Sequence, residues 1–224
     1  MSSTTMSLAS ITKKTIMALA GLFLIVFLVI HMGINLFLMP ITENHVEIFK
    51  EAAEFMGTNP LIKFMEIFLM AAFLLHIVYG VIVQIQNWRA RGHRYAVAQK
   101  TKTSFLSRYM IYTGILIFLF LGLHFYQFYF IKLGLVVRPD GLGEHDFYKI
   151  AVELFQNDLM YNIIYVVSFV FLAFHMNHAF QSAFQTLGLN HPKYMPWIKG
   201  FGTLYSIILG VGFTSIPVYF YFFH

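Results

Sequence analysis

Four histidines of this chain lie deep inside otherwise apolar stretches, namely His31, His76, His124 and His175. An ionisable side chain at membrane depth is energetically costly, so its presence there indicates a function. Neutral imidazole is a common axial ligand of heme iron. The chain contains no cysteine, which excludes cysteine-ligated iron–sulfur clusters and covalently attached c-type heme. The four histidines therefore predict two hemes b, each held by a pair of imidazoles and not covalently attached to the protein.

The stretches that position these histidines have the length and composition of membrane-spanning helices. Of the 224 residues, 58% are hydrophobic and 11% are charged, whereas a soluble domain carries about a quarter charged residues. A span needs about 20 mainly apolar residues, and five segments qualify, at about 15–39, 61–86, 109–132, 160–187 and 198–223. We therefore predict an all-α fold, in which residues 1–224 form one transmembrane bundle of five helices with two hemes between helices one to four.

Charged residues are distributed unequally between the connections of these helices. Ten basic residues and no acidic one lie before the first span or in the segments 87–108 and 188–199. All ten acidic residues lie in the other connections or at their helix ends. Because basic residues favour the cytoplasmic side, the N-terminus is expected inside and the C-terminus outside. The positive charge of the chain therefore indicates membrane topology and not nucleic-acid binding.

Two of the outer connections have amphipathic patterns. Residues 41–60 mix glutamates with apolar side chains, and residues 147–155 follow a similar pattern. Such segments are typical of short helices at the membrane interface.

The depth of each histidine predicts how the four are paired. Helix direction alternates, and each residue rises 1.5 Å along a helix. His31 and His124 both lie about eight residues from the outer ends of their helices, whereas His76 and His175 lie about ten and twelve residues from the inner ends. We therefore expect His31 and His124 to hold an outer heme, and His76 and His175 to hold an inner heme.

The remaining histidines are weaker candidates. His178 lies three residues after His175 and shares its helix face, so it is either an alternative ligand or a contact of a heme propionate. Five further histidines lie in connections or at the chain end, where a solvated surface role is expected: His45, His93, His145, His191 and His224. A single membrane histidine is as well explained by a hydrogen bond between helices, but four at two matched depths favour ligands.

Several segments resemble the five-helix diheme cytochrome b subunit of succinate dehydrogenases and fumarate reductases. The most specific segment is residues 175–188, with the sequence HMNHAFQSAFQTLG, which resembles the fourth helix of that family. Residues 13–35 resemble its first helix, through Lys13-Lys14-x-x-Met17-Ala18-x-x-Gly21 and Phe27-x-x-x-His31-x-x-x-Asn35. His76-x-x-x-Gly80 and His124 fit the second and third helices. The resemblance covers essentially the whole chain.

The resemblance implies a membrane-anchor subunit of a succinate:quinone oxidoreductase in the cytoplasmic membrane of a bacterium. Its partners would be a flavoprotein subunit and an iron–sulfur subunit on the cytoplasmic face, and the dicarboxylate chemistry would take place outside this chain. Electrons would pass between the iron–sulfur subunit, the inner heme, the outer heme and a quinone, with menaquinone expected. Both directions, succinate oxidation and fumarate reduction, stay open.

Glu66 is the candidate residue for proton exchange with the quinone. It lies about five residues inside the second span, near the expected level of the outer heme. The alternative is an acid that faces water at a helix start. Three further glutamates of the outer connection are rival candidates, namely Glu47, Glu51 and Glu54.

Two other classes of protein fit part of this pattern. One is a heme-free transporter whose histidines bind protons or a divalent metal. The other is the cytochrome b subunit of a hydrogenase or a formate dehydrogenase, which also carries histidines on several helices.

Overall fold

The computed structural model describes residues 3–90, 105–138, 140–143 and 146–223, and only the backbone at positions 3–10, 90 and 105–108. Within these ranges the chain forms helices and turns without any β-strand. Five helical segments are long and apolar enough to cross a membrane. The predicted all-α, five-span architecture is thereby confirmed.

The spanning segments agree with the predicted ranges to within a few residues at most of their ends. They are α1 (Ser3–Leu36), α3 (Pro60–Ala90), the continuous run α4 (Phe105–His124), η1 (Phe125–Tyr129) and α5 (Phe130–Lys132), then α7 (Leu159–Thr186) and α8 (Met195–Phe223). Helix α1 begins well before the predicted start at residue 15, and its apolar part is Ile11–Leu36. Two short helices, α2 (His45–Thr58) and α6 (Phe147–Asn157), connect the spans.

Local sequence signals set the ends of these helices. The Asp158 carboxylate accepts hydrogen bonds from the backbone N–H groups of Met160 at 2.8 Å and Tyr161 at 3.1 Å, which caps the start of α7. Helix α7 ends before Gly188, whose φ of +82° lies in the left-handed region that glycine adopts without strain. Helix α1 ends at Leu36, four residues before Pro40, because proline cannot continue a helix.

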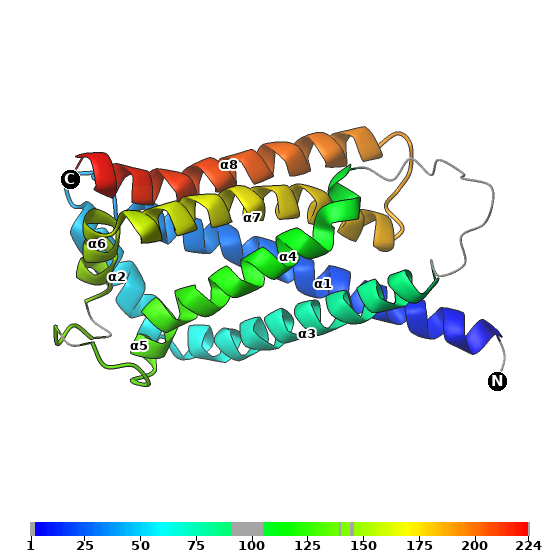
Figure 1. Cartoon of the computed structure of the whole chain (residues 1–224), viewed down its shortest axis with the longest axis horizontal. Coiled ribbons are helices and arrows are strands. Elements are labelled where there is room, and N and C mark those ends of the chain that lie inside the picture. Colours follow the sequence, from blue (N-terminus) through cyan, green and yellow to red (C-terminus); the bar gives the residue numbers. More distant parts are fainter. Residues whose placement is uncertain (1–2, 91–104, 139, 144–145, 224) are drawn as a thin grey trace.

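Helices α2 and α6 lie together at one end of the bundle, which we call the capped end (Figure 1). Both form where the amphipathic patterns predicted helices. The apolar side of α6 is buried in the protein, with Ile150 fully inaccessible to solvent, so this helix closes the bundle as well as lying at its edge. The loop before α6 is held by Arg138, which pairs with Asp140 and, at 2.9 Å, with Glu153.

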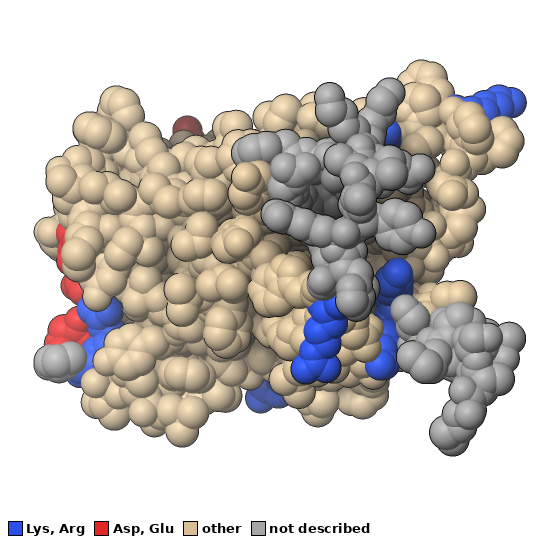
Figure 2. All heavy atoms as spheres, turned by 45° about the vertical axis from the view of Figure 1, so that its right-hand side comes forward, with Lys and Arg blue, Asp and Glu red and all other residues tan. Residues whose placement is uncertain are grey.

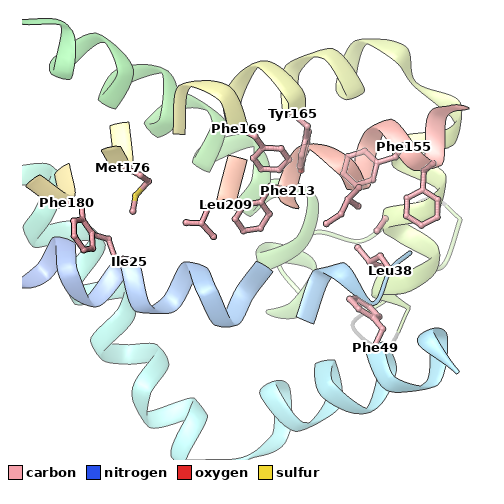
Figure 3. Close-up of a cluster of buried hydrophobic side chains, with 13 residues drawn as sticks. Ile25, Leu38, Phe49, Phe155, Tyr165, Phe169, Met176, Phe180, Leu209 and Phe213 are labelled. Carbon is pink, nitrogen blue, oxygen red and sulfur yellow. The ribbon is translucent and has the colours of Figure 1, made fainter. Parts of the chain in front are cut away.

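The main apolar core lies among α1, α7, α8 and the two capping helices (Figure 3). Helices α7 and α8 approach closely because glycines face bulky side chains. A Cβ atom on Gly202 would lie only 2.7 Å from Cδ1 of Phe180, whereas one on Gly200 would meet nothing within 4 Å. Helix α3 packs chiefly on α1, and α4 packs chiefly on α7, with little contact between α3 and α4.

The described acidic residues lie at the capped end, whereas described basic residues lie at both ends of the bundle, as Figure 2 illustrates. The described acidic residues lie in or beside α2, α6 and the nearby ends of α3 and α7. The opposite end, formed by the start of α1, the end of α3 and the α7–α8 connection, carries Lys13, Lys14, Arg89, Lys193 and Lys199. The basic segment 91–104 lies outside the described residues.

Candidate functional site

The four histidines come together as two pairs within the bundle. The ring centres of His31 on α1 and His124 on α4 are 5.9 Å apart, with an angle of 83° between the ring planes. Those of His76 on α3 and His175 on α7 are 6.2 Å apart, at 75°. These are the same two pairs that helix direction and depth predicted.

The separation within each pair suits a metal held from opposite sides. Two imidazoles that each bind through a ring nitrogen at about 2.0 Å from one metal ion have ring centres roughly 6 Å apart. Within the described ranges no three His, Asp or Glu side chains converge as a metal-binding group. A pair of imidazoles supplies two ligands, so each pair suits a metal whose other ligands come from elsewhere, as the four nitrogens of a heme macrocycle do.

Each of three helices contacts both histidine pairs, through two residues that are ten positions apart. The residues at the pair His31–His124 are His31 on α1, His124 on α4 and Tyr165 on α7. Those at the pair His76–His175 are Gly21 on α1, Gly114 on α4 and His175 on α7. Ten residues of helix span about 15 Å. The pair His31–His124 lies nearer the capped end, and His76–His175 lies nearer the opposite end. The two pairs therefore occupy levels about 15 Å apart along the bundle.

Hydrogen bonding fixes the tautomer of His175. Its Nδ1 lies 3.2 Å from the hydroxyl oxygen of Thr113, and that hydroxyl donates its own proton to the carbonyl of Met110 at 2.8 Å. The Thr113 oxygen can therefore only accept, so His175 must donate from Nδ1–H. The lone pair of the neutral ring then lies on Nε2, which is the atom a metal would bind.

His124 has the same arrangement with different partners. Its Nδ1 lies 3.4 Å from the hydroxyl oxygen of Tyr165, and Tyr165 donates its proton to the side-chain oxygen of Gln127 at 2.6 Å. Gln127 lies in the π-helical segment η1, which begins immediately after His124. Single π turns inside α-helices are frequent at functional sites, and here the wider turn carries the residue that orients Tyr165.

His76 donates to the backbone of α1. Its Nδ1 lies 3.4 Å from the carbonyl oxygen of Met17, an atom that can only accept, so the Nε2 lone pair is again free. Gly21 makes this approach possible, since a Cβ atom there would lie 3.3 Å from both Nδ1 and Cε1 of His76. Gly114 faces His175 in a similar way, with its Cβ position 3.6 Å from Cε1.

His31 is the exception among the four. Its Nδ1 lies 3.4 Å from the amide nitrogen of Asn35, which donates a much shorter bond of 2.7 Å to the backbone carbonyl of His31 itself. The ring of His31 instead packs in an aromatic environment, stacked on Phe27 at 5.2 Å and 5.9 Å from Phe213. Its orientation therefore depends more on packing than on a hydrogen bond.

The residues present fit two hemes. Each pair supplies two imidazoles at the required separation, and in three of the four rings the Nδ1 partner leaves the lone pair on Nε2. Glycine at positions 21 and 114 leaves room beside the rings of the pair His76–His175. The weak packing between α3 and α4 is compatible with a flat group between the helices. No cysteine competes for the metal.

The other histidines are not brought into these pairs. The ring that contacts His76 is that of His175 and not that of His178. His45 packs within the capped end, with Nδ1 3.3 Å from the carbonyl of Phe37, so it is less solvated than predicted. His191 accepts a hydrogen bond from the backbone of Lys193 at 3.2 Å in the exposed α7–α8 connection. His93, His145 and His224 lie outside the described residues.

Glu66 is paired with a lysine from another span. Its Oε2 accepts a hydrogen bond from Nζ of Lys132 at 2.7 Å, and the Tyr129 hydroxyl also bonds to it. The side chains of Glu66 and Lys132 are 20% and 26% exposed, so the ion pair is neither fully buried nor fully solvated. The rival acids Glu47, Glu51 and Glu54 are all exposed on α2.

Sequence reasoning did not identify the partners of the histidines. Thr113 and Gln127 carry no signal that separates them from other polar residues in apolar helices, and the Met17 partner is a backbone carbonyl. Tyr165 is 2% exposed and is one of many aromatic residues. The ten-residue spacing shared by α1, α4 and α7 becomes meaningful only when the contacts between helices are known.

Comparison with protein-family models, with curated proteins and with solved structures gives no match, so the interpretation of the paired histidines rests on this chain alone.

Proposed function

We propose that the chain is a diheme cytochrome b, with one heme bound by His31 and His124 and the other by His76 and His175. The observation that carries this proposal is the pair of His–His separations, 5.9 and 6.2 Å, together with the Nδ1 partners that leave Nε2 free in three of the rings. A heme-free metal transporter fits less well, because two imidazoles leave most of the coordination sites of a bare ion unfilled.

The proposed orientation places the capped end outside and the opposite end in the cytoplasm. The charges support this, because the end opposite the caps carries basic residues and no described acidic residue, whereas the capped end carries both signs (Figure 2). The pair His31–His124 then holds the outer heme, and the pair His76–His175 holds the inner heme. The membrane would be the cytoplasmic membrane of a bacterium.

Within this class we propose a membrane-anchor subunit of a succinate:quinone oxidoreductase. One support is the resemblance of residues 13–35 and 175–188 to that family. The other is that the described residues form only the bundle and its two capping helices, with no further domain among them that could hold flavin. A flavoprotein and an iron–sulfur subunit would dock at the basic cytoplasmic end. The alternative is the cytochrome b subunit of a hydrogenase or formate dehydrogenase.

Heme iron, when bound, supplies one-electron transfer between its ferric and ferrous states. The chain contributes binding and tuning. Thr113, Tyr165 and the Met17 carbonyl orient the imidazoles and increase their basicity by accepting from Nδ1–H. Aromatic side chains around His31 and His124, including Phe27, Phe120 and Phe128, exclude water from the outer site.

For the quinone we propose a site at the capped end beside Glu66 and Lys132. The ion pair places a carboxylate and an ammonium next to the Tyr129 hydroxyl, so a proton acceptor and two donors converge on the side of the outer heme. Glu66 would exchange the proton with menaquinone or menaquinol, and Lys132 would stabilise the carboxylate when it is charged.

The test of heme content is a reduced-minus-oxidised spectrum of the purified complex with quantified heme and flavin. We expect b-type bands, two hemes per chain and flavin in a co-purifying subunit. A chain that carries no heme would refute the diheme proposal. Two hemes with a co-purifying hydrogenase or formate dehydrogenase subunit would refute the succinate:quinone assignment and retain the hemes.

The test of the quinone site compares Glu66→Gln with Glu54→Gln. Both remove one carboxylate from the capped end, but Glu54 is exposed on α2 and has no part in the ion pair. We expect Glu66→Gln to lower quinone turnover at least tenfold while dithionite still reduces both hemes, and Glu54→Gln to keep normal turnover. Normal turnover in Glu66→Gln would remove this residue from the site.

A further inference from the structure

A shallow cavity, open to the surface, lies at the end of the bundle opposite the caps, between α1 and α7. Its volume is about 290 Å³, and it is lined by Ile11, Lys14, Ser182, Gln185 and Thr186. Four of these five residues are polar, although α1 and α7 are mainly apolar helices. The cavity is not used by either histidine pair or by the proposed quinone site.

The cavity is aligned with the pair His76–His175 on both helices. On α1, Lys14 precedes Gly21, the residue against His76, by seven positions. On α7, Ser182 follows His175 by seven positions. Seven residues make nearly two full helical turns. Lys14 therefore lies on the same helix face as Gly21, and Ser182 on the same face as His175, in each case about 10 Å away along the helix axis.

The lining is suited to an anionic oxygen group. Lys14 supplies an ammonium, and Gln185 and Ser182 supply an amide and a hydroxyl that can donate. The hydroxyl of Thr186 already donates to the carbonyl of Ser182 at 2.8 Å. None of the described acidic residues belongs to this end of the bundle, so no described carboxylate of the chain is placed to neutralise Lys14.

We propose that this cavity binds a propionate of the heme held by His76 and His175, with Lys14 as its counter-ion and Gln185 and Ser182 as hydrogen-bond donors. This inference rests on the proposed diheme function. A carboxylate at membrane depth is stable only when it is paired or hydrogen-bonded, and the cavity provides both on the helix faces of Gly21 and His175. The heme is thereby oriented with its propionate edge toward the cytoplasmic end.

The proposed contact has an electrostatic consequence. Loss of the Lys14 charge at roughly 10 Å from the iron, with an effective dielectric constant of about 20, changes the oxidation equilibrium by up to about fifteenfold. Removing a nearby cation favours the ferric form. At fixed ambient potential, the ratio of reduced to oxidised inner heme in Lys14→Gln should therefore fall roughly three- to fifteenfold.

The experiment is a potentiometric titration of the intact purified complex, followed in the heme absorption bands, for wild type, Lys14→Gln, Lys14→Arg and Lys13→Gln. Lys13 is the matched control, because its replacement removes the same charge from the same helix but it does not line the cavity. We expect Lys14→Gln to lower the potential of one heme only, Lys14→Arg to keep it at the wild-type value, and Lys13→Gln to cause a clearly smaller shift than Lys14→Gln.

A heme-free wild-type complex would refute the proposed function itself. Two intact hemes with unshifted potentials in Lys14→Gln would refute only the propionate contact. Equal shifts in Lys14→Gln and Lys13→Gln would also refute it, because they would reflect the general charge of this end. If native mass spectrometry found that Lys14→Gln lost a bound anionic phospholipid without a change in either heme potential, the cavity would be a headgroup site and the proposal would be overturned.

Discussion

Replacing Thr113 by valine removes the hydroxyl that accepts from Nδ1–H of His175 and leaves a side chain of nearly the same shape. The Thr113 hydroxyl oxygen lies 3.2 Å from Nδ1 of His175. The substitution also removes the 2.8 Å hydrogen bond that this hydroxyl donates to the carbonyl of Met110, which lies within the same helix. In the proposed diheme protein, the His175 ring then lacks its acceptor and is a weaker ligand of the heme iron. A weaker ligand favours ferrous iron, so we expect the potential of the inner heme to rise.

The size of this rise follows from the energy of the hydrogen bond. A net contribution of about 1 kcal/mol is a typical value for one intramolecular hydrogen bond. If all of it were lost from the ferric state, the one-electron potential would rise by up to about 40 mV. Thr113→Ser keeps the hydroxyl and is the matched control, with an expected shift close to zero.

The assay is a redox titration of both hemes, and Tyr165→Phe provides the reciprocal variant. Tyr165 accepts from His124, so its replacement should raise the potential of the other heme and leave the one affected by Thr113→Val unchanged. Two outcomes would refute the assignment of one Nδ1 acceptor to each heme. One is a variant that shifts the potentials of both hemes, and the other is that neither variant shifts the potential of any heme.

Three further predictions test the packing and the loop at the capped end. Gly21→Ala places a methyl group 3.3 Å from the facing imidazole, so the bands or potential of one heme should change, whereas Gly33→Ala, with nothing within 4 Å, should leave the spectrum as in wild type. Gly202→Ala overpacks the facing phenylalanine, and thermal unfolding in detergent should report a loss of about 1–3 kcal/mol, against no loss for Gly200→Ala. The pKa of Asp140 is lowered to about 2 by its arginine partner, so its contribution to loop stability is complete above the ordinary value near 3.8 and is lost as the pH falls through about 2. Hydrogen exchange in this loop, corrected for the intrinsic pH dependence, should therefore stay constant from pH 8 to 5, and a loss of protection within that window would contradict the ion pair.

The architecture was accessible from the sequence because the membrane restricts the possible structures. Runs of about 20 apolar residues can only be helices, and their alternating direction sets the depth of every residue on them. The pairing of His31 with His124 and of His76 with His175 follows from depth alone. The amphipathic segments at 41–60 and 147–155 likewise formed the helices that their patterns predicted.

The partners of the histidines were not accessible, because they depend on rotation about helix axes. Depth does not say which face of α7 meets α4, so neither Tyr165 beside His124 nor Thr113 beside His175 could be derived. The π segment after His124 shifts the register of the last turns before Lys132, and a single sequence contains no signal for it. The ion pair of Glu66 depends on that register, since Lys132 comes from another span 66 positions away.

The distance between the two histidine levels has a consequence for energy conversion. A step of about 15 Å along the bundle is about half of the ~30 Å hydrocarbon thickness. A full crossing by one elementary charge changes its energy by about 2.3 kcal/mol per 100 mV of transmembrane voltage, so this half crossing corresponds to about 1.2 kcal/mol. With an iron at each level, every 100 mV across the membrane would redistribute an electron between the two sites by roughly sevenfold. In the proposed diheme protein, the ten-residue spacing in α1, α4 and α7 would thus make the occupancy of the two sites depend on the voltage.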